Sequence, residues 1–326
     1  MLASTMTICK TMNKSELKII YMGTPDFAVE PLRQLVEGGY NIVAVVTMPD
    51  KPAGRGHHLQ FSPVKKYALE QNLPVLQPER LKDESWLAEL RSYNADLQVV
   101  VAFRMLPEVV WSMPPLGTFN LHASLLPEYR GAAPINWAVI NGEARTGVTT
   151  FFLQHEIDTG DIIMQRSVDI SDDDNAGTVH DRLMMLGSSM VTETVDLILA
   201  NNVHPTKQPD LVIKPAPKIF KETCELHFDR PAAELHNLVR GLSPYPGAWT
   251  TLPNGDVVKV FRTHYVIIKD EQMQQGRVES DSKTYIRIAC TDGWLYLDEL
   301  QLPAKKRMPV SDLLRGIHDI THLTTR

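Results

Sequence analysis

The chain has 326 residues, of which 43% are hydrophobic and 22% are charged. These proportions are ordinary for a globular protein with a substantial core, and the length favours two domains. No apolar run approaches the ~20 residues that a membrane-spanning helix needs, so we expect no contact with a membrane. The three cysteines, Cys9, Cys224 and Cys290, are widely spaced and form no C-x-x-C pair, which argues against a disulfide framework or a zinc site. Such cysteine use fits the reducing cytoplasm.

The net charge of −6 does not by itself suggest a nucleic-acid-binding protein. The charge is unevenly distributed, since residues 1–214 carry −7 and residues 215–326 carry +1. The C-terminal third is therefore the more basic part, although only mildly.

The first residues are polar and mixed, and they lack the continuous apolar stretch of a signal peptide. We predict that residues 1–16 form a disordered N-terminal extension.

Between residues 17 and 204, strand and helix patterns alternate. Strands are predicted at residues 18–22, 42–47, 97–102 and 118–122, and a final strand pair at 148–153 and 161–166. Helices are predicted at residues 27–36, 63–71, 134–141 and 178–200, the first capped by Asp26 and the second by Ser62 with Pro63 in its first turn. This alternation predicts an α/β fold with a doubly wound, mainly parallel sheet.

The composition changes near residue 201. Four prolines, Pro205, Pro209, Pro215 and Pro217, punctuate a segment with little periodicity, and we predict a linker over residues 205–220. Beyond it, short strands are separated by hairpin turns at Asn254-Gly255 and Asp292-Gly293. This spacing predicts a small antiparallel β-barrel of the OB type over residues 221–326.

The densest chemical signal is the run from Asn120 to Pro127, which begins inside a predicted strand. Residues two apart in a strand point to the same face, so Asn120 and His122 project side by side at the carboxyl edge of the sheet. An amide donor beside an imidazole can stabilise an oxyanion. Judged from the spacing alone, a polar pair that ends a strand is the better interpretation.

A second signal is Asp158, followed by Thr159-Gly160-Asp161 between two apolar runs. A carboxylate on a glycine turn can reach into a cleft and polarise a histidine or accept a proton. The commoner use of such a sequence is a surface turn stabilised by aspartate.

A third signal is the glycine-punctuated, cationic stretch at residues 48–58, directly after a strand. It lacks the ending of a phosphate-binding P-loop, and no G-x-G-x-x-G follows the first strand, so nucleotide hydrolysis and dinucleotide binding are both disfavoured. Adjacent histidines such as His57 and His58 suit one metal ion poorly, so we expect a solvated loop without metal.

Taken together, these motifs resemble the methionyl-tRNA formyltransferase family. The similarity rests on residues 23–29, the loop at 51–56, the run at 120–127 and the turn at 158–161, with further matches at 243–249 and 300–307 in the second domain. It covers nearly the whole chain from Leu17, and several motifs in the same order are far more specific than any one of them.

The resemblance implies roles for individual residues. Asn120, His122 and Asp158 match the family's catalytic trio, Arg55 matches a loop arginine that contacts the tRNA acceptor end, and residues 124–127 match its folate-contact segment. The residues of that segment are Ser124, Leu125, Leu126 and Pro127. By the same resemblance, residues 17–204 form the catalytic domain and residues 221–326 the tRNA-contacting domain. The co-substrate is 10-formyltetrahydrofolate, the acceptor is initiator methionyl-tRNA, and we expect a cytoplasmic monomer that needs no metal.

The second domain departs from the family's pattern. The barrel of the family is usually more basic, whereas residues 215–326 carry a net charge of only +1. Affinity for nucleic acid depends largely on neutralising phosphates, so the tRNA contact needs specific cations. Candidates lie in the linker and near the C-terminus. They are Lys214, Lys218, Lys221, Lys305, Lys306 and Arg307. Each taken singly reads better as part of a solvated charge cluster.

Two other functions fit parts of the sequence. A formyltransferase acting on an amino-sugar nucleotide resembles this chain in fold and trio, but the loop around Arg55 and the basic segment at 305–307 favour tRNA. Glycinamide ribonucleotide formyltransferases lack the extra barrel. A non-catalytic RNA-binding relative is the alternative from another class, and the intact trio argues against it.

Overall fold

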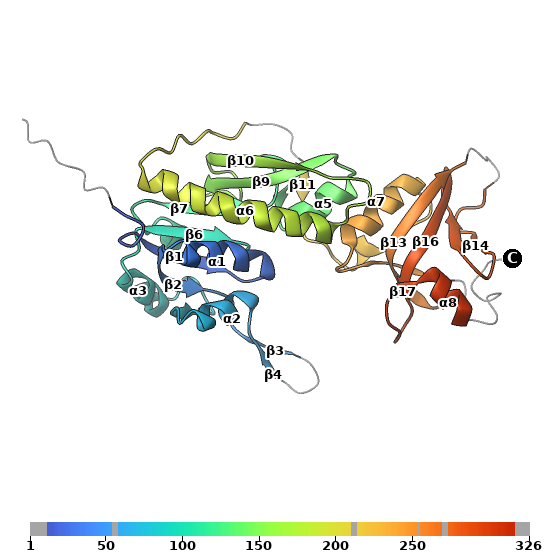
Figure 1. Ribbon diagram of the computed structural model, residues 1–326, viewed down its shortest axis with the longest axis horizontal. Coiled ribbons are helices and arrows are strands. Elements are labelled where there is room, and N and C mark those ends of the chain that lie inside the picture. The colour runs from blue at the N-terminus through green and yellow to red at the C-terminus, as the bar shows by residue number, and fades with distance from the viewer. Residues whose placement is uncertain (1–11, 54–57, 210–213, 253–254, 269–272, 317–326) are drawn as a thin grey trace, which may run out of the picture. The chain divides into compact units, whose positions relative to one another are not determined.

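The computed structural model describes residues 12–53, 58–209, 214–252, 255–268 and 273–316 (Figure 1). The chain forms two compact units. The first contains residues 1–128, 147–167 and 181–213, and the second contains residues 129–146, 168–180 and 214–326.

The first unit is built on a seven-stranded sheet of order β10-β9-β7-β6-β1-β2-β5 (Figure 1). Its strands are β1 (Lys18–Gly23), β2 (Asn41–Val46), β5 (Val75–Leu76), β6 (Leu97–Val101), β7 (Thr118–His122), β9 (Arg145–Phe152) and β10 (Ile162–Asp169). Neighbours from β7 through β5 run parallel, and β9 is antiparallel to β7. The predicted mainly parallel sheet is confirmed.

Helices cover both faces of this sheet, as a doubly wound fold requires. They are α1 (Val29–Glu37), α2 (Pro63–Glu70), α3 (Glu84–Ser92), α4 (Glu108–Trp111) and α6 (Ala176–Leu199). Helix α6 approaches the face that carries Leu121, because a Cβ on Gly187 would lie 2.7 Å from Leu121 Cδ2. On the other face, Trp86 of α3 belongs to the same core cluster as Met22 and Val100. Alternate strand residues point to opposite faces, so Asn120 and His122 project away from α6.

The first helix starts differently from the prediction. Asp26–Ala28 form a short 3₁₀ turn, η1, and α1 begins at Val29, so the prediction of Asp26 as a helix cap is wrong. The prediction for α2 is confirmed, since Ser62 Oγ accepts a hydrogen bond from Lys65 N at 3.0 Å and Pro63 occupies the first turn.

The residues just before β1 are ordered. Residues 13–16 form a turn in which the backbone N–H of Glu16 donates to Asn13 O at 3.1 Å. Lys14 Nζ lies 2.9 Å from the hydroxyl of Tyr40 and 3.1 Å from Asp196 Oδ1 on α6. This ion pair attaches residues that we expected to be disordered, while residues 1–11 lie outside the described residues.

The second unit contains an antiparallel sheet of order β12-β13-β16-β15-β14, and β17 pairs with β16 at Glu299 and Leu300. Its strands are β12 (Ala248–Thr251), β13 (Val257–Ile267), β14 (Val278–Ser280), β15 (Ile286–Ala289), β16 (Gly293–Gln301) and β17 (Met308–Pro309). Both predicted hairpins form, the first around Gly255 at φ +87° and the second at Asp292-Gly293. Asn254 lies outside the described residues.

Two helices of the second unit were not predicted, α7 (Ala232–Leu242) and α8 (Val310–Gly316). Leu235 and Val239 of α7 and Leu313 of α8 join the core formed by the strands. Their apolar residues do recur at helical spacing, but the neighbouring hairpin turns give the stronger local signal.

The second unit also recruits residues from the middle of the chain. Helix α5 (Pro134–Ile140) packs tightly on α7, because a Cβ on Gly241 would lie 2.4 Å from Ile140 Cγ1. Strand β8 (Arg130–Gly131) pairs in parallel with β11 (Pro215–Ala216). The division by packing therefore differs from the contiguous domains expected from sequence, which remain a prediction.

Candidate functional site

The end of β7 carries the first two residues of the candidate trio. His122 is buried, and Asn120 is half-buried two residues earlier in the same strand. Within the described residues, Asn120 Oδ1 is buried and receives no hydrogen bond. Buried polar atoms are nearly always paired, so this amide oxygen has the capacity to accept a hydrogen bond from a bound molecule.

Asp158 supplies the third member, from the turn between β9 and β10. Its Oδ2 lies 3.9 Å from His122 Nδ1, and the two side chains are 11% and 7% exposed. The backbone of Asp158 has φ +55°, a left-handed conformation that aspartate tolerates better than most residues. The turn therefore brings a carboxylate to an imidazole through a conformation that few other residues adopt easily.

The same turn depends on a glycine. A Cβ on Gly160 would lie 1.6 Å from the backbone oxygen of Phe152, so no other residue fits. On the other side of the turn, Phe152 N donates to Asp161 O at 3.1 Å. This close approach of backbone fixes where β10 starts relative to β9, and with it the direction of Asp158.

The trio provides the groups that acyl transfer needs. A carboxylate near an imidazole attracts the protonated ring, and this attraction is little screened when both groups are mostly buried. The Asn120 amide offers a donor and an acceptor close by. The three residues that sequence analysis singled out are thus assembled in one place.

The predicted folate-contact segment is a tightly held loop after β7. Thr149 Oγ1 donates to Ser124 O at 2.6 Å and accepts from Leu126 N at 3.2 Å. Gln165 Nε2 donates to Leu126 O at 2.8 Å. Ser124 is fully buried, and its hydroxyl donates to Glu128 O at 2.6 Å. The Ser124 hydroxyl therefore shapes the loop, while Leu125 and Pro127 are the half-buried members that a ligand can reach.

The candidate tRNA contacts differ in how far their charges are already engaged. Lys214 Nζ pairs with the carboxylate of Glu143, and Arg307 makes two hydrogen bonds of 2.6 Å to Glu299. Lys218 is exposed and lies 5.6 Å from the ring centroid of Phe220.

Lys305 and Lys306 are exposed in the turn before β17. Arg55, the predicted contact on the β3–β4 connection, lies outside the described residues. Its flanking strands, β3 (Lys51–Ala53) and β4 (His58–Gln60), pair in antiparallel fashion.

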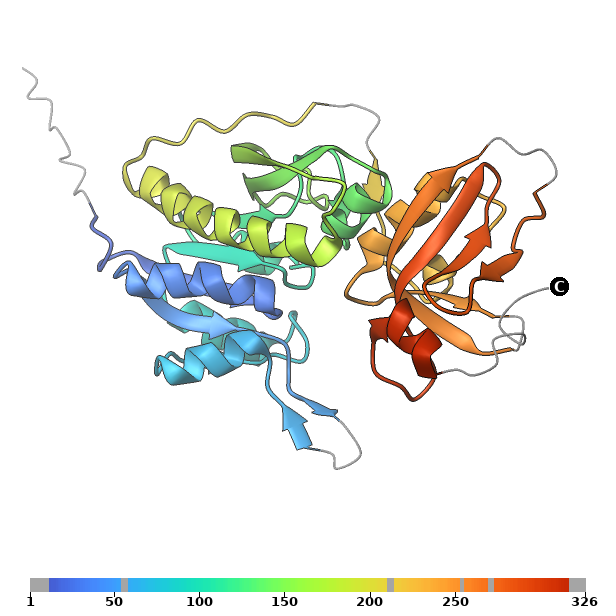
Figure 2. The ribbon, with the colours of Figure 1, turned by 45° about the vertical axis from the view of Figure 1, so that its right-hand side comes forward.

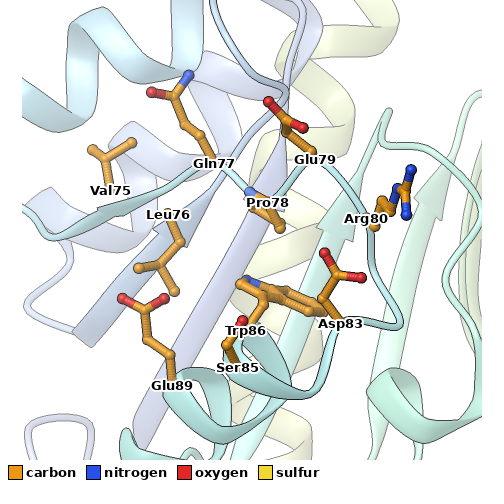
Figure 3. Close-up of a pocket in the computed structure, with 10 residues that line it drawn as sticks. All are labelled: Val75, Leu76, Gln77, Pro78, Glu79, Arg80, Asp83, Ser85, Trp86 and Glu89. Atoms are coloured by element: carbon orange, nitrogen blue, oxygen red, sulfur yellow. The ribbon is translucent and has the colours of Figure 1, made fainter.

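A pocket of about 440 Å³ lies elsewhere on the first unit, between the end of β5 and the start of α3 (Figure 3). Its lining is mostly polar and does not include the trio. It consists of Val75, Leu76, Gln77, Pro78, Glu79, Arg80, Asp83, Ser85, Trp86 and Glu89. This pocket and the chemical groups of the trio are therefore separate.

Three further side chains that support the site were not predicted. Thr149 and Gln165 hold the loop after β7, and Gln208 binds the turn that carries Asp158. Thr149 and Gln165 sit inside predicted strands, and Gln208 sits in the segment predicted as a linker. Each acts through a contact distant in sequence, so no local pattern points to it.

Known protein families match almost the whole chain. A family model described as formyl transferase matches residues 17–195, and one described as formyl transferase, C-terminal domain, matches residues 218–318. A methionyl-tRNA formyltransferase from Bacteroides thetaiotaomicron is 61% identical over 313 residues, covering 94% of this chain and 97% of the relative. The chain belongs to the methionyl-tRNA formyltransferase family.

Other relatives agree. Methionyl-tRNA formyltransferases from Parabacteroides distasonis and Flavobacterium johnsoniae are 57% and 52% identical, covering 96% and 93% of this chain and 99% and 96% of their own lengths.

Solved structures with the same fold are more distant in sequence. An N-formyltransferase from Helicobacter canadensis, in complex with folinic acid and dTDP-3-aminofucose, has a TM-score of 0.66 at 20% identity and covers 88% of this chain and all of its own. HypX from Aquifex aeolicus in complex with tetrahydrofolic acid has a TM-score of 0.62 at 19% identity, covering 92% and 47%. These likenesses show the fold of this methionyl-tRNA formyltransferase family member.

The described residues form neither a membrane-spanning helix nor a cluster of metal-ligating side chains. In the parts of the chain that the structure describes, no helix is long and apolar enough to cross a membrane. Among the described side chains, no three or more His, Cys, Asp or Glu form a group that could hold a metal ion.

Proposed function

We propose that this chain transfers the formyl group of 10-formyltetrahydrofolate to the amino group of methionine esterified to initiator tRNA, in the cytoplasm and as a monomer. The observation that carries the proposal is the assembly of His122 and Asp158 beside Asn120 in a chain that is 61% identical to a methionyl-tRNA formyltransferase.

The chemistry needs positioning more than strong activation. A free α-amino group has a pKa of ~7.7–8.0, and esterifying the carboxyl group lowers it, so a useful neutral fraction exists at pH 7. Asn120 Oδ1, which lacks a partner among the described residues, is suited to accept an N–H from that amine and aim its lone pair. No metal ion is needed for such an attack.

The trio then stabilises charge as it develops. The amine nitrogen forms a bond to the formyl carbon, whose carbonyl oxygen becomes an oxyanion. Asn120 Nδ2 donates to that oxygen, and protonated His122 offsets its charge. Asp158 attracts the charged ring from 3.9 Å and helps to remove the amine proton, which passes to the departing folate nitrogen as its bond to the formyl carbon breaks.

Binding surfaces for the two substrates follow from the same proposal. Leu125 and Pro127 contact the folate from the loop after β7, while Arg55 holds the acceptor end of the tRNA. Lys218, Lys305 and Lys306 are better placed to meet phosphates than Lys214 and Arg307, whose charges are already paired with Glu143 and Glu299.

Sugar formyltransferases share the fold, so an amino-sugar nucleotide is the competing acceptor. A panel of acceptors separates the two. It contains methionyl initiator tRNA, methionyl elongator tRNA and a dTDP-amino sugar, each supplied with 10-formyltetrahydrofolate. We expect formylation of the initiator tRNA well above the other two acceptors. Preferential formylation of the sugar nucleotide would refute the proposal.

A further inference from the structure

A buried glutamine, Gln208, is bound to the turn that carries Asp158. Gln208 is 4% exposed, and its Nε2 donates to the backbone oxygen of Asp158 at 2.9 Å and to that of Gly160 at 2.8 Å. An amide NH₂ has two N–H groups, so one side chain can serve both carbonyls. Gln208 thus joins the two ends of the turn from Asp158 to Gly160.

The backbone around Gln208 is itself fixed to the sheet. Thr206 and Ile162 exchange two backbone hydrogen bonds, each 2.8 Å long, at the start of β10. The segment that follows α6 therefore runs back beside β10, as Figures 1 and 2 show. Because Gln208 lies two residues after Thr206, its position is set by the same strand that begins after the turn.

Two properties of the turn from Asp158 to Gly160 call for such support: its backbone conformation and the placement of the Asp158 carboxylate near His122. Asp158 has φ +55°, a left-handed conformation that costs free energy and persists only where neighbouring contacts hold the backbone in it. The 3.9 Å from Asp158 Oδ2 to His122 Nδ1 is longer than a hydrogen bond, so their interaction depends directly on where the turn places the carboxylate. Misplacing a reacting group by ~1 Å can lower a rate by ~10²-fold.

We propose that Gln208 is a positioning residue, which holds Asp158 in place for formyl transfer through its two hydrogen bonds to the turn. The inference rests on the proposed function, in which Asp158 serves the reaction. It assigns a role in catalysis to a residue of the proline-punctuated segment after α6.

The first test replaces Gln208 in the full-length chain and follows a single turnover at saturating substrates. Gln208→Ala is expected to lower the rate about tenfold or more, with KM for both substrates nearly unchanged, because the Gln208 side chain is buried and only 4% exposed. Gln208→Glu keeps the size but replaces the NH₂ donor by a carboxylate oxygen that repels both carbonyls, so it should be at least as slow. Lys207→Ala, at the exposed neighbouring position, is the matched control and should behave as the wild type.

The second test asks whether Gln208 acts through Asp158. Adding Gln208→Ala to Asp158→Asn should lower the residual rate by less than about twofold, because residues working as one unit are non-additive. The same fold-loss in both backgrounds would show a general packing role and overturn the inference. Gln208→Glu replaces the alanine variant in this cycle if that variant fails to fold.

The outcomes also separate this inference from the proposed function. If Asp158→Asn is slow while both Gln208 variants keep the full rate, only the role of Gln208 is refuted. If Asp158→Asn is fully active, the catalytic trio fails and the role of Gln208 fails with it.

Discussion

The imidazole of His122 and the carboxylate of Asp158 face each other at 3.9 Å, Nδ1 to Oδ2, although one ends β7 and the other lies between β9 and β10. Both side chains are mostly buried, so water screens their attraction only partly. In the proposed mechanism, Asp158 serves the reaction together with His122, so the two side chains should act as one unit.

We therefore predict that His122→Ala and Asp158→Asn each abolish most activity and that the double variant is little slower than either single variant. Residues that act as one unit are strongly non-additive. Single-turnover rates of the three variants test this. Losses that multiply would show that the two residues act separately.

Asn120→Ala should leave the fold intact and slow the chemical step by about 10²–10³, the usual effect of removing one oxyanion donor. The fold should survive because Asn120 Oδ1 has no partner to lose among the described residues. Circular dichroism of this variant reports whether the fold is intact, and its single-turnover rate reports the loss in the chemical step. A near-normal rate would remove Asn120 from the proposed trio.

At the N-terminus, we predict that deleting residues 1–12 leaves the melting temperature unchanged, whereas Lys14→Ala lowers it slightly. Lys14 pairs with Asp196 and Tyr40, and a half-exposed ion pair contributes only ~0.2–1 kcal/mol. Thermal unfolding of both variants is the measurement. A large drop for the deletion would mean that residues before Asn13 stabilise the fold.

Asp50 gives stability a defined dependence on pH. The hydrogen bond from Lys65, followed by that from Gln77, holds the pKa of Asp50 below its usual 3.8. A lowered folded-state pKa means that the stabilising contribution is present above pH 3.8 and is lost as pH falls through the lowered value. Asp50→Asn should therefore be less stable than wild type at pH 7, and the difference should shrink below pH 3.8.

Denaturant unfolding at several pH values follows that difference. Asp173→Asn, at an exposed position on the same chain, serves as the control and should show little change at any pH. A difference for Asp50→Asn that stays constant down to pH 2 would contradict the assignment. The result matters for function, because Asp50 and Lys65 lie at the base of the β3–β4 hairpin that carries Arg55.

Much of the first unit follows from local patterns. Strand β7 was predicted with its observed bounds, Thr118–His122, because an apolar strand that ends in spaced polar residues is a strong signal. The pairing of Asn120 with His122 on one face follows from the same periodicity. Ser62 and Pro63 likewise determine the start of α2 through a side-chain cap and a fixed φ.

What could not be predicted depends on contacts between distant residues. Nothing near Gln208 in sequence indicates that its side chain reaches Asp158, and nothing near Thr149 indicates that it holds Ser124. Asp26 shows the opposite error. Its position before an amphipathic stretch favours a helix cap, but Asp26 is the first residue of the 3₁₀ turn that precedes α1. The packing of α5 on α7 likewise joins residues that no local pattern connects.

The central claim is tested most directly by the mass of the product. Purified protein is incubated with 10-formyltetrahydrofolate and methionyl initiator tRNA, the aminoacyl group is released by mild base, and its mass is measured. The account predicts N-formylmethionine in an amount equal to the folate consumed, and its loss in His122→Ala. Unmodified methionine with the wild-type protein, or equal formylation by His122→Ala, would contradict it.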